Sequence, residues 1–333
     1  MRVTNKMMSS NVVNNIQNNL SKMDKTNDRL SKGTKINTPQ DDPTGAVKTM
    51  SYKTTINEIE KFSTNAVNAK NFLSYTDVSL GQISDILQRV RELAVQASTE
   101  TYEQTARDAI GEEVNELIDQ VISIGNGKVG DRFIFGGFNT IETPFRAIRG
   151  QEKFENDGVK PDLIHATGTL REGINKNSIV EVEYSGDEGK LITEVDKGIV
   201  IEYNVPGSDI FLKGERNLID SMIRLRDQIY MGNTVEDIAK VGTTVNKELG
   251  NVDKTLDEVM RYRSQVGARM RRIDQIEERL KDNKISMSNL LSRTQDTDIT
   301  ETISDLKVQE SVQRMSLSVG AKVIQPTLMD FLR

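Results

Sequence analysis

Few residues in this sequence have the types and spacing that catalysis or metal binding requires. Gly125-Asn-Gly-Lys-Val-Gly130 has the glycine spacing of a dinucleotide-binding loop. Such a loop needs a strand before it and a helix after it, because the phosphate binds at the helix N-terminus. Here a helical pattern precedes and a strand-like pattern follows, so we interpret the segment as a helix end that enters a hairpin.

The remaining candidates for chemistry are a histidine and two pairs of carboxylates. His165 is the only histidine and cysteine is absent, which excludes disulfides, thiol nucleophiles and metal sites rich in either residue. Asp41-Asp42 and Asp296/Asp298 could bind Ca²⁺ or act as acid and base. Each pair lies at a break before a helix, where Asp commonly caps free backbone N–H groups. We therefore expect no catalytic residue, no metal and no cofactor.

Composition indicates a helical protein with little large globular core. The 333 residues suffice for two or three domains, aromatic residues make up 5% and tryptophan is absent. The net charge of −6 argues against general nucleic-acid binding. The N-terminal stretch has no continuous apolar segment, so we expect no cleaved secretory signal, and no apolar run is long enough to span a bilayer.

Long helical apolar patterns lie at both ends of the chain. Apolar residues at steps of three and four predict one helix over about 4–31 and another after residue 298. The C-terminal pattern is too wide for one partner helix to cover, so we expect part of it to pack between copies. The predicted assembly interface consists of Val13, Ile16, Leu20, Met23, Leu30, Ile303, Leu306, Val312, Met315, Leu317, Val319 and Val323.

Two further series of apolar residues at alternating steps of three and four, here called ladders, lie between the terminal patterns. One runs unbroken from Ile59 to Ala97 and the other from Val245 to Leu291, with Arg263, Glu277 and Lys284 in slots that are usually apolar. Two prolines within residues 37–43 forbid a continuous helix there, and Asp42-Pro43 fits the N-cap and first position of a new helix.

Alternating aromatic and β-branched residues beside glycines predict a hairpin near 128–138, and short β-like runs follow it. The sequence thus predicts a mainly α fold: an elongated antiparallel helical bundle, or coiled-coil rod, formed by both chain ends, with a small β-rich inserted domain. The predicted domains are terminal helices over 1–40 and 296–333, a helical rod over 41–138 and 214–295, and a β-rich outer insert over 139–213.

Three motifs resemble the flagellin family, which includes flagellins and their relatives at the hook–filament junction. The first is the segment from Leu30 to Gly45, whose Asp-Asp-Pro form looks more like the junction proteins. The others are Arg132-Phe-Ile-Phe-Gly-Gly137 and the C-terminal segment after Ile324. The matching motif residues are Asp41, Asp42, Pro43, Arg132, Phe133, Phe135, Gly137, Pro326, Leu328, Phe331 and Leu332.

The resemblance implies an extracellular structural subunit of the bacterial flagellum, at the hook–filament junction. Such a subunit would be exported by the flagellar type III route without a cleaved signal, and an export chaperone would hold its C-terminal helix. Its terminal helices would then form the inner tube, with further copies of itself, a neighbouring hook-associated protein and flagellin as partners. No nucleic acid and no membrane insertion are expected.

Two alternatives to the junction adaptor stay open. The chain could be flagellin, the bulk filament subunit, because both share the architecture. It could also carry an enzyme in the insert, such as a surface hydrolase using Asp162 and His165, although the lone histidine and the lack of cysteine argue against this.

Overall fold

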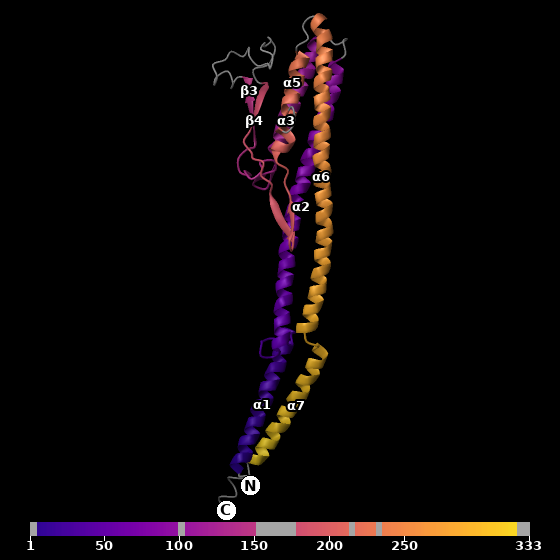
Figure 1. Ribbon diagram of the computed structural model, residues 1–333. Coiled ribbons are helices and arrows are strands. Elements are labelled where there is room, and N and C mark those ends of the chain that lie inside the picture. The colour runs from indigo at the N-terminus through magenta and orange to yellow at the C-terminus, as the bar shows by residue number, and fades with distance from the viewer. Residues whose placement is uncertain (1–4, 99–103, 151–177, 213–216, 231–234, 325–333) are drawn as a thin grey trace, which may run out of the picture. The chain divides into compact units, whose positions relative to one another are not determined.

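The computed structural model of the chain describes residues 5–98, 104–150, 178–212, 217–230 and 235–324 (Figure 1). These residues form two compact units. The first combines the chain up to Glu60 with the chain from Lys281 onward, and the second comprises Lys61–Leu280. Among the described helices, none has both the length and the apolar character of a membrane span.

The first unit is built from helices of both chain ends. Helix α1 (Asn5–Lys32) lies beside α7 (Ile299–Ile324), as Figure 1 shows. The unit also contains the beginning of α2 (Pro43–Ala97) and the end of α6 (Val235–Gln295). Gly33, with φ of +67°, ends α1 in the left-handed conformation that glycine adopts without steric cost. The predicted first helix and its end are confirmed.

In the second unit, the α2 residues of the predicted ladder form a buried stripe. From Ala66 to Ala97 its members are nearly inaccessible to solvent, including the polar Thr76, whose hydroxyl donates to the Phe72 carbonyl at 2.9 Å. That bond explains how a threonine can occupy a core position, because its hydroxyl is satisfied within its own helix.

Of the positions that the α6 ladder predicted to be buried, about every second one is confirmed. Val245, Val252, Val259, Val266, Ile273 and Leu280 are buried as predicted. The intervening positions are shifted by one residue, so Tyr262 and Ile276 are buried where we predicted Arg263 and Glu277. Steps of three then four and steps of four then three both keep residues on one face of a helix. The apolar residues alone therefore predicted the wrong intervening positions.

The displaced charged residues pair across the helices instead. Within the second unit, Arg263 Nε lies 3.2 Å from Asp77 Oδ1, and Lys70 Nζ lies 3.3 Å from Glu277 Oε2. Residue numbers rise along α2 as they fall along α6, so the helices are antiparallel. In the first unit, Lys284 Nζ lies 2.9 Å from Glu60 Oε1. These partly exposed pairs contribute little free energy, but they help to fix which residues face one another.

Helix α3 (Gln104–Gly125) and helix α5 (Leu218–Tyr230) pack together in the second unit. Within α3, Ile118 and Ile122 are buried, whereas Leu117 and Ile124 are half-buried. A hairpin of β1 (Lys128–Val129) and β2 (Arg132–Phe133) follows directly. Gly125–Gly130 is therefore a helix end that enters a hairpin, as predicted.

The described part of the predicted insert is β-rich. Its strands form two antiparallel pairs: β3 (Phe145–Arg149) with β4 (Ile179–Tyr184), and β5 (Ile192–Asp196) with β6 (Ile199–Glu202). A short π-helix, η1 (Ser208–Leu212), places Phe211 against Phe135 and Phe145, at ring centroid distances of 5.5 and 4.5 Å. Asp162 and His165 lie outside the described residues. The prediction of a mainly α fold with a small β-rich insert is confirmed.

Candidate assembly surface

The facing sides of α1 and α7 form a seam, defined here as the positions that are less exposed than their neighbours on each helix. The positions follow alternating steps of three and four, as in a coiled coil. On α1 the seam consists of Ser9, Val12, Ile16, Asn19, Met23, Thr26 and Leu30. On α7 it consists of Thr302, Leu306, Gln309, Gln313, Ser316 and Gly320.

Polar and small residues dominate the α7 side of the seam. Asn19 Nδ2 donates to Ser316 Oγ at 3.2 Å across the seam. The Oε1 atoms of Gln309 and Gln313 are buried and have no hydrogen-bond partner in the described structure. Each unsatisfied buried acceptor costs about 1–3 kcal/mol. These two acceptors therefore reduce the stability that the seam gives to the α1–α7 pair.

Many apolar residues of the two helices lie outside the seam and are exposed. Met315, Leu317 and Val319 are 60%, 52% and 56% exposed. We call this set the outer face; it consists of Met7, Met8, Val13 and Leu20 on α1, and Ile299, Ile303, Val308, Val312, Met315, Leu317 and Val319 on α7. Apolar side chains this numerous on two adjacent helices are typical of a surface that packs against another protein.

The predicted interface residues divide between these two surfaces. Ile16, Met23, Leu30 and Leu306 lie in the seam. The exposed members are Val13, Leu20, Ile303, Val312, Met315, Leu317 and Val319, and the side chain of Val323 lies outside the described part.

The sequence left open which face of the C-terminal helix packs against α1. In the structure Thr302 and Ser316 lie in the seam, whereas the neighbouring Ile303 and Leu317 are exposed. Sequence reasoning missed the seam because it searched for apolar residues, whereas the seam on this helix is mainly polar. The available signal was the polar series at Thr302, Gln309, Gln313 and Ser316, which keeps the same alternating spacing.

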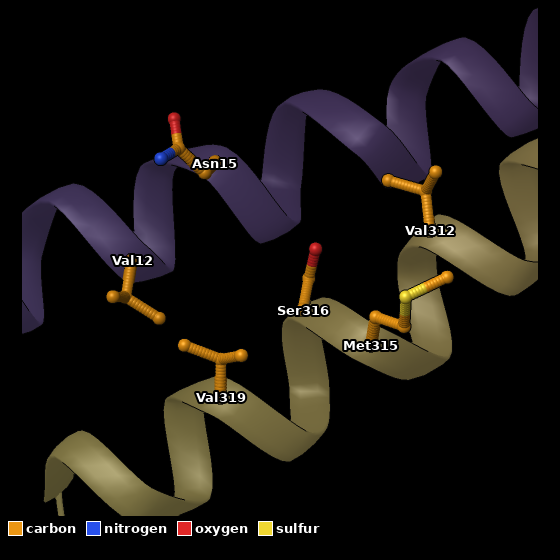
Figure 2. A pocket seen from close by; sticks show the side chains of 6 residues that line it. All are labelled: Val12, Asn15, Val312, Met315, Ser316 and Val319. Carbon is orange, nitrogen blue, oxygen red and sulfur yellow. The ribbon is translucent and has the colours of Figure 1, made fainter.

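A groove lies between the two helices on the outer face (Figure 2). Its volume is about 250 Å³, and its lining residues are Val12, Asn15, Val312, Met315, Ser316 and Val319. Figure 2 shows Val12 and Val319 pointing toward one another across it. The lining is mostly apolar, so the groove suits apolar side chains.

The two breaks between helices lie side by side in the first unit. Thr34 and Asp296 form a β-bridge, Lys35 N donates to the Gln295 carbonyl at 2.7 Å, and Thr297 N donates to the Gly33 carbonyl at 3.1 Å. The chain that leaves α1 is thus tied by backbone bonds to the chain that enters α7.

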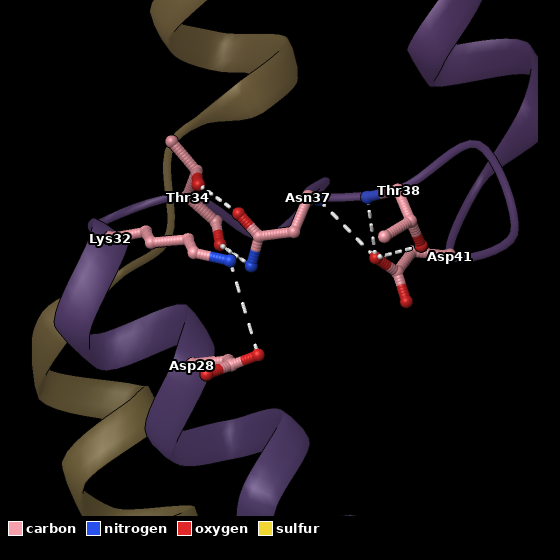
Figure 3. Close-up of polar contacts among 6 residues, drawn as sticks. All are labelled: Asp28, Lys32, Thr34, Asn37, Thr38 and Asp41. Atoms are coloured by element: carbon pink, nitrogen blue, oxygen red, sulfur yellow. Dashed lines mark hydrogen bonds and ion pairs between the residues drawn. The ribbon is translucent and has the colours of Figure 1, made fainter.

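The two aspartates of the Asp-Asp-Pro motif have different tasks. Asp41 Oδ2 accepts hydrogen bonds from Thr38 N and Thr38 Oγ1, both at 3.0 Å, and from Asn37 N at 3.3 Å (Figure 3). These bonds, that from the Thr38 amide most of all, hold the pKa of Asp41 below its usual value. Asp42 Oδ1 accepts from Thr44 N at 3.1 Å and caps α2, which begins at Pro43. Capping was thus correct for Asp42, whereas Asp41 closes the preceding loop.

The second pair of aspartates also has structural tasks. Asp298 Oδ1 accepts from Thr300 N at 2.8 Å and caps α7, whereas Asp296 Oδ2 accepts from Ser292 Oγ at 2.6 Å. In the described part of the chain, no cluster of three or more His, Asp or Glu residues could hold a metal ion.

The second motif lies at the hairpin. Phe133 and Phe135 are buried, whereas Arg132 is exposed. Gly137 has φ of +70°, and a Cβ there would lie 2.0 Å from Asp187 Oδ1, so only glycine fits. The third motif, with Pro326, Leu328, Phe331 and Leu332, lies outside the described residues.

Curated relatives of this chain include both hook-associated proteins and flagellins. It is 20% identical over 317 residues to flagellar hook-associated protein 3 of Escherichia coli, and the match covers 95% of each chain. It is 23% identical over 328 residues to the flagellin of Bacillus subtilis, covering 98% of this chain and 97% of that one. A shorter match, 33% identical over 126 residues, covers 38% of this chain and 33% of the flagellin of Clostridium tyrobutyricum.

The fold has solved counterparts, and both ends of the chain match family models. The crystal structure of flagellar hook associated protein-3 from Legionella pneumophila superposes with a TM-score of 0.60 at 14% identity, covering 73% of this chain and 98% of that one. The model of the bacterial flagellin N-terminal helical region matches residues 3–140, and that of the C-terminal helical region matches residues 249–332. Since these two regions supply the paired terminal helices and the long helices α2 and α6, the chain belongs to the flagellin family.

Proposed function

We propose that this chain is a structural adaptor subunit that joins hook to filament in the bacterial flagellum. The observation that carries the proposal is the large number of exposed apolar residues on α1 and α7 that the seam between these two helices does not cover. A subunit that assembles through its terminal helices needs such an uncovered face. The full-length similarity to hook-associated protein 3 of Escherichia coli supports the junction over other positions in the flagellum.

The proposed organisation assigns one task to each part of the chain. The terminal helices, over 1–40 and 296–333, form the inner tube with other copies. The helical region over 41–138 and 214–295 packs around that tube, and the insert over 139–213 faces outward. The neighbours are a hook-associated protein on one side and flagellin on the other. The role is structural and uses no catalysis.

The proposed route to this position is type III export without a cleaved signal. An export chaperone that covers the C-terminal helix would prevent the exposed apolar residues of α7 from associating in the cytoplasm. The free subunit would thus keep its outer face uncommitted until it reaches the growing structure.

Flagellin is the second candidate function, because the match to the Bacillus subtilis flagellin also spans almost the whole chain. Deletion of the gene separates the two candidates. For an adaptor, the cell builds hooks and sheds flagellin monomers into the medium. For flagellin, the cell builds hooks and junctions, and the medium lacks the main filament protein.

The assembly surface is tested with Val13→Asp combined with Leu317→Asp in the full-length chain. Both residues are exposed on the outer face, so the subunit should keep the helical content of the original chain but no longer assemble. Ser318→Asp, on the exposed side of the same helix, is the matched control and should assemble normally. Normal assembly of the double variant would contradict the proposed surface.

A further inference from the structure

We propose that the groove on one side of the α1–α7 pair receives a ridge, formed by Val13 and Leu20, from the opposite side of the pair in the next copy of this chain. The inference rests on the proposed function and deepens it, because it states which side of the terminal helices meets which side of a neighbour. Each copy thus offers a groove to one neighbour and a ridge to the other.

The exposed apolar residues of α7 lie on two opposite sides of the seam. Successive residues of an α-helix are turned by about 100° around its axis. Val312, Met315 and Val319 each come one residue before a seam residue, and they line the groove. Ile303 and Leu317 each come one residue after a seam residue. We call the first the groove side of the pair and the second the reverse side.

Helix α1 divides in the same way. Asn15, which lines the groove, comes one residue before a seam residue. Val13 and Leu20 each come one residue after a seam residue, which places them on the reverse side. They are 42% and 44% exposed and lie about two helical turns apart on one stripe. Val13 and Leu20 therefore form an apolar ridge that faces away from the groove.

The ridge and the groove lie at the same level of the pair. Asn19 contacts Ser316, and Gly320 lies beside Val12, so the two helices are antiparallel. Leu20, next to Asn19, is therefore at the level of the groove. A neighbour that sits beside the first copy, with little shift along the helices, brings its ridge directly to the groove.

The spacing of the ridge also matches that of the groove. Val13 and Leu20 are seven residues apart, and so are Val312 and Val319. Both intervals measure about 10.5 Å at 1.5 Å per residue. The neighbour's Val13 can thus pack against Val319 while its Leu20 packs against Met315 and Val312.

The hollow shape of the groove favours a ridge over a second groove as its occupant. Its volume is about 250 Å³ and its lining is mostly apolar. Two grooves placed face to face would leave both hollows unfilled, whereas packed protein interiors contain few voids. A protruding pair of aliphatic side chains fills the hollow and removes hydrocarbon of both copies from water.

Charges on α1 support the same arrangement. Lys22, Lys25 and Arg29 each come one residue before a seam residue and lie on the groove side. Asp24 comes one residue after a seam residue and lies on the reverse side, at the same level. A neighbour that brings its ridge to the groove therefore also brings its Asp24 to this basic row. Such exposed pairs add little affinity but favour the correct orientation.

On α7 the signs are exchanged. Glu301 and Asp305 lie on the groove side, whereas Lys307 lies on the reverse side, followed by Glu310 and Arg314, which pair with one another at 3.6 Å. The groove side of one copy and the reverse side of the next are thus complementary along both helices.

The contact is heterologous, because two different surfaces of the same chain meet. A heterologous contact repeats from copy to copy until a ring closes or a filament forms. One contact buries few side chains, so free copies stay apart and their terminal helices remain uncommitted. In an assembly every copy makes the contact twice, once through its groove and once through its ridge.

The test uses the absence of cysteine from the chain. Leu20→Cys combined with Met315→Cys places one thiol on each side of the pair, and the full-length variant replaces the original chain in cells. Oxidation of isolated flagella with diamide should link successive copies and give a ladder of dimers, trimers and larger species on a non-reducing gel. Val13→Cys with Val319→Cys should give the same ladder. Cysteine behaves as a small apolar residue, so both variants should assemble.

The single variants Leu20→Cys and Met315→Cys should stay monomeric, because in each the facing residue of the neighbour is not a thiol. Ser21→Cys with Met315→Cys is the matched control; Ser21 is exposed but lies on neither side, so this pair should give no ladder. Dimers from a single variant would show that a side meets itself, and a disulfide within one chain would place both residues on one side. Either result, or the lack of a ladder from both pairs in assembled flagella, would overturn the proposal.

Failure of this contact can be told apart from failure of the proposed function. A chain that antibody labelling finds at the junction, but that forms no ladder, retains the adaptor role and loses the contact. A chain that forms the ladder along the whole filament retains the contact and loses the adaptor role.

Discussion

Arg226 connects three elements of the second unit through one buried guanidinium. Its Nη1 donates to Asn115 Oδ1 at 2.7 Å and to the Ile179 carbonyl at 2.8 Å, and its Nη2 lies 2.7 Å from Asp227 Oδ1. The side chain is 2% exposed, so these bonds form in a region of low dielectric constant. Arg226 therefore links helix α5 by polar contacts to both helix α3 and strand β4.

Arg226→Met should lower the free energy of unfolding of the second unit by about 3 kcal/mol, because the buried partners lose their guanidinium. Chemical denaturation followed by circular dichroism measures the loss. Arg224→Met is the matched control on the exposed side of α5 and should change stability by less than about 0.5 kcal/mol. An equal loss of unfolding free energy in the two variants would show that the buried contacts of Arg226 do not add to the stability of the second unit.

Asp41 makes the loop before α2 sensitive to acid. Its hydrogen bonds from Thr38 and Asn37 lower the pKa of the carboxyl below the ordinary value of 3.8. The loop contacts should thus be fully formed above pH 3.8 and lost as the pH falls through the lower pKa of the folded state. Amide hydrogen exchange at Asn37 and Thr38, corrected for the intrinsic pH dependence, measures this change. In Asp41→Asn the corrected protection should not vary over that range, and a persisting pH dependence would assign the effect to another group.

At the scale of elements, the α1–α7 pair is stabilised less than its length suggests. The buried Oε1 atoms of Gln309 and Gln313 have no hydrogen-bond partner in the described structure, and Gly320 contributes no side chain opposite Val12. The pair can therefore separate and reform at low cost, which suits helices that must find new neighbours during assembly.

Gln309→Leu combined with Gln313→Leu should stabilise the pair by roughly 2–4 kcal/mol, because two unsatisfied acceptors are replaced by buried hydrocarbon. Slower hydrogen exchange along α7 in the free chain is the expected result. Ser318→Leu adds an apolar residue to the same helix outside the seam and should leave the exchange rates unchanged. Faster exchange in the double variant would mean that the two glutamine side chains form stabilising hydrogen bonds in solution.

The sequence predicts an element well when that element buries an apolar stripe, and poorly when it buries polar residues. The α2 ladder was predicted almost residue by residue, because Leu73, Leu80, Leu87 and their neighbours bury one apolar stripe. The α7 seam could not be predicted in this way, since its inward residues are polar and its apolar residues face outward. The physical reason for a glycine at 137 became visible only with Asp187, distant in the sequence, in place beside it.

The two units of the whole molecule differ in how much apolar surface they bury. Among the described side chains of the first unit, only Ile36 and Ile59 are buried large apolar residues, whereas the second unit buries a long series of them. Regions with few buried apolar contacts open locally with small free energies. The first unit should therefore open well before the second unit unfolds.

Hydrogen exchange on the free full-length chain should show amides of α1 and α7 exchanging many times faster than amides of α2 between Ala66 and Ala97. Limited proteolysis should likewise cut within residues 1–40 and 299–333 first. The assembled protein is the control, since packing between copies should protect both segments. Intact ends in the free monomer after digestion would argue against an assembly role for these helices.

The joint between the two helix breaks is made almost entirely of main-chain atoms. Thr34 and Asp296 are paired through their backbones, and the bonds from Lys35 and Thr297 reach carbonyl groups, not side chains. Most side-chain replacements at these positions leave the joint intact, whereas a proline at 35 or 297 removes a donor that no other residue replaces. The side chains at the two helix breaks can therefore vary while the backbone pairing between the two chain ends stays the same.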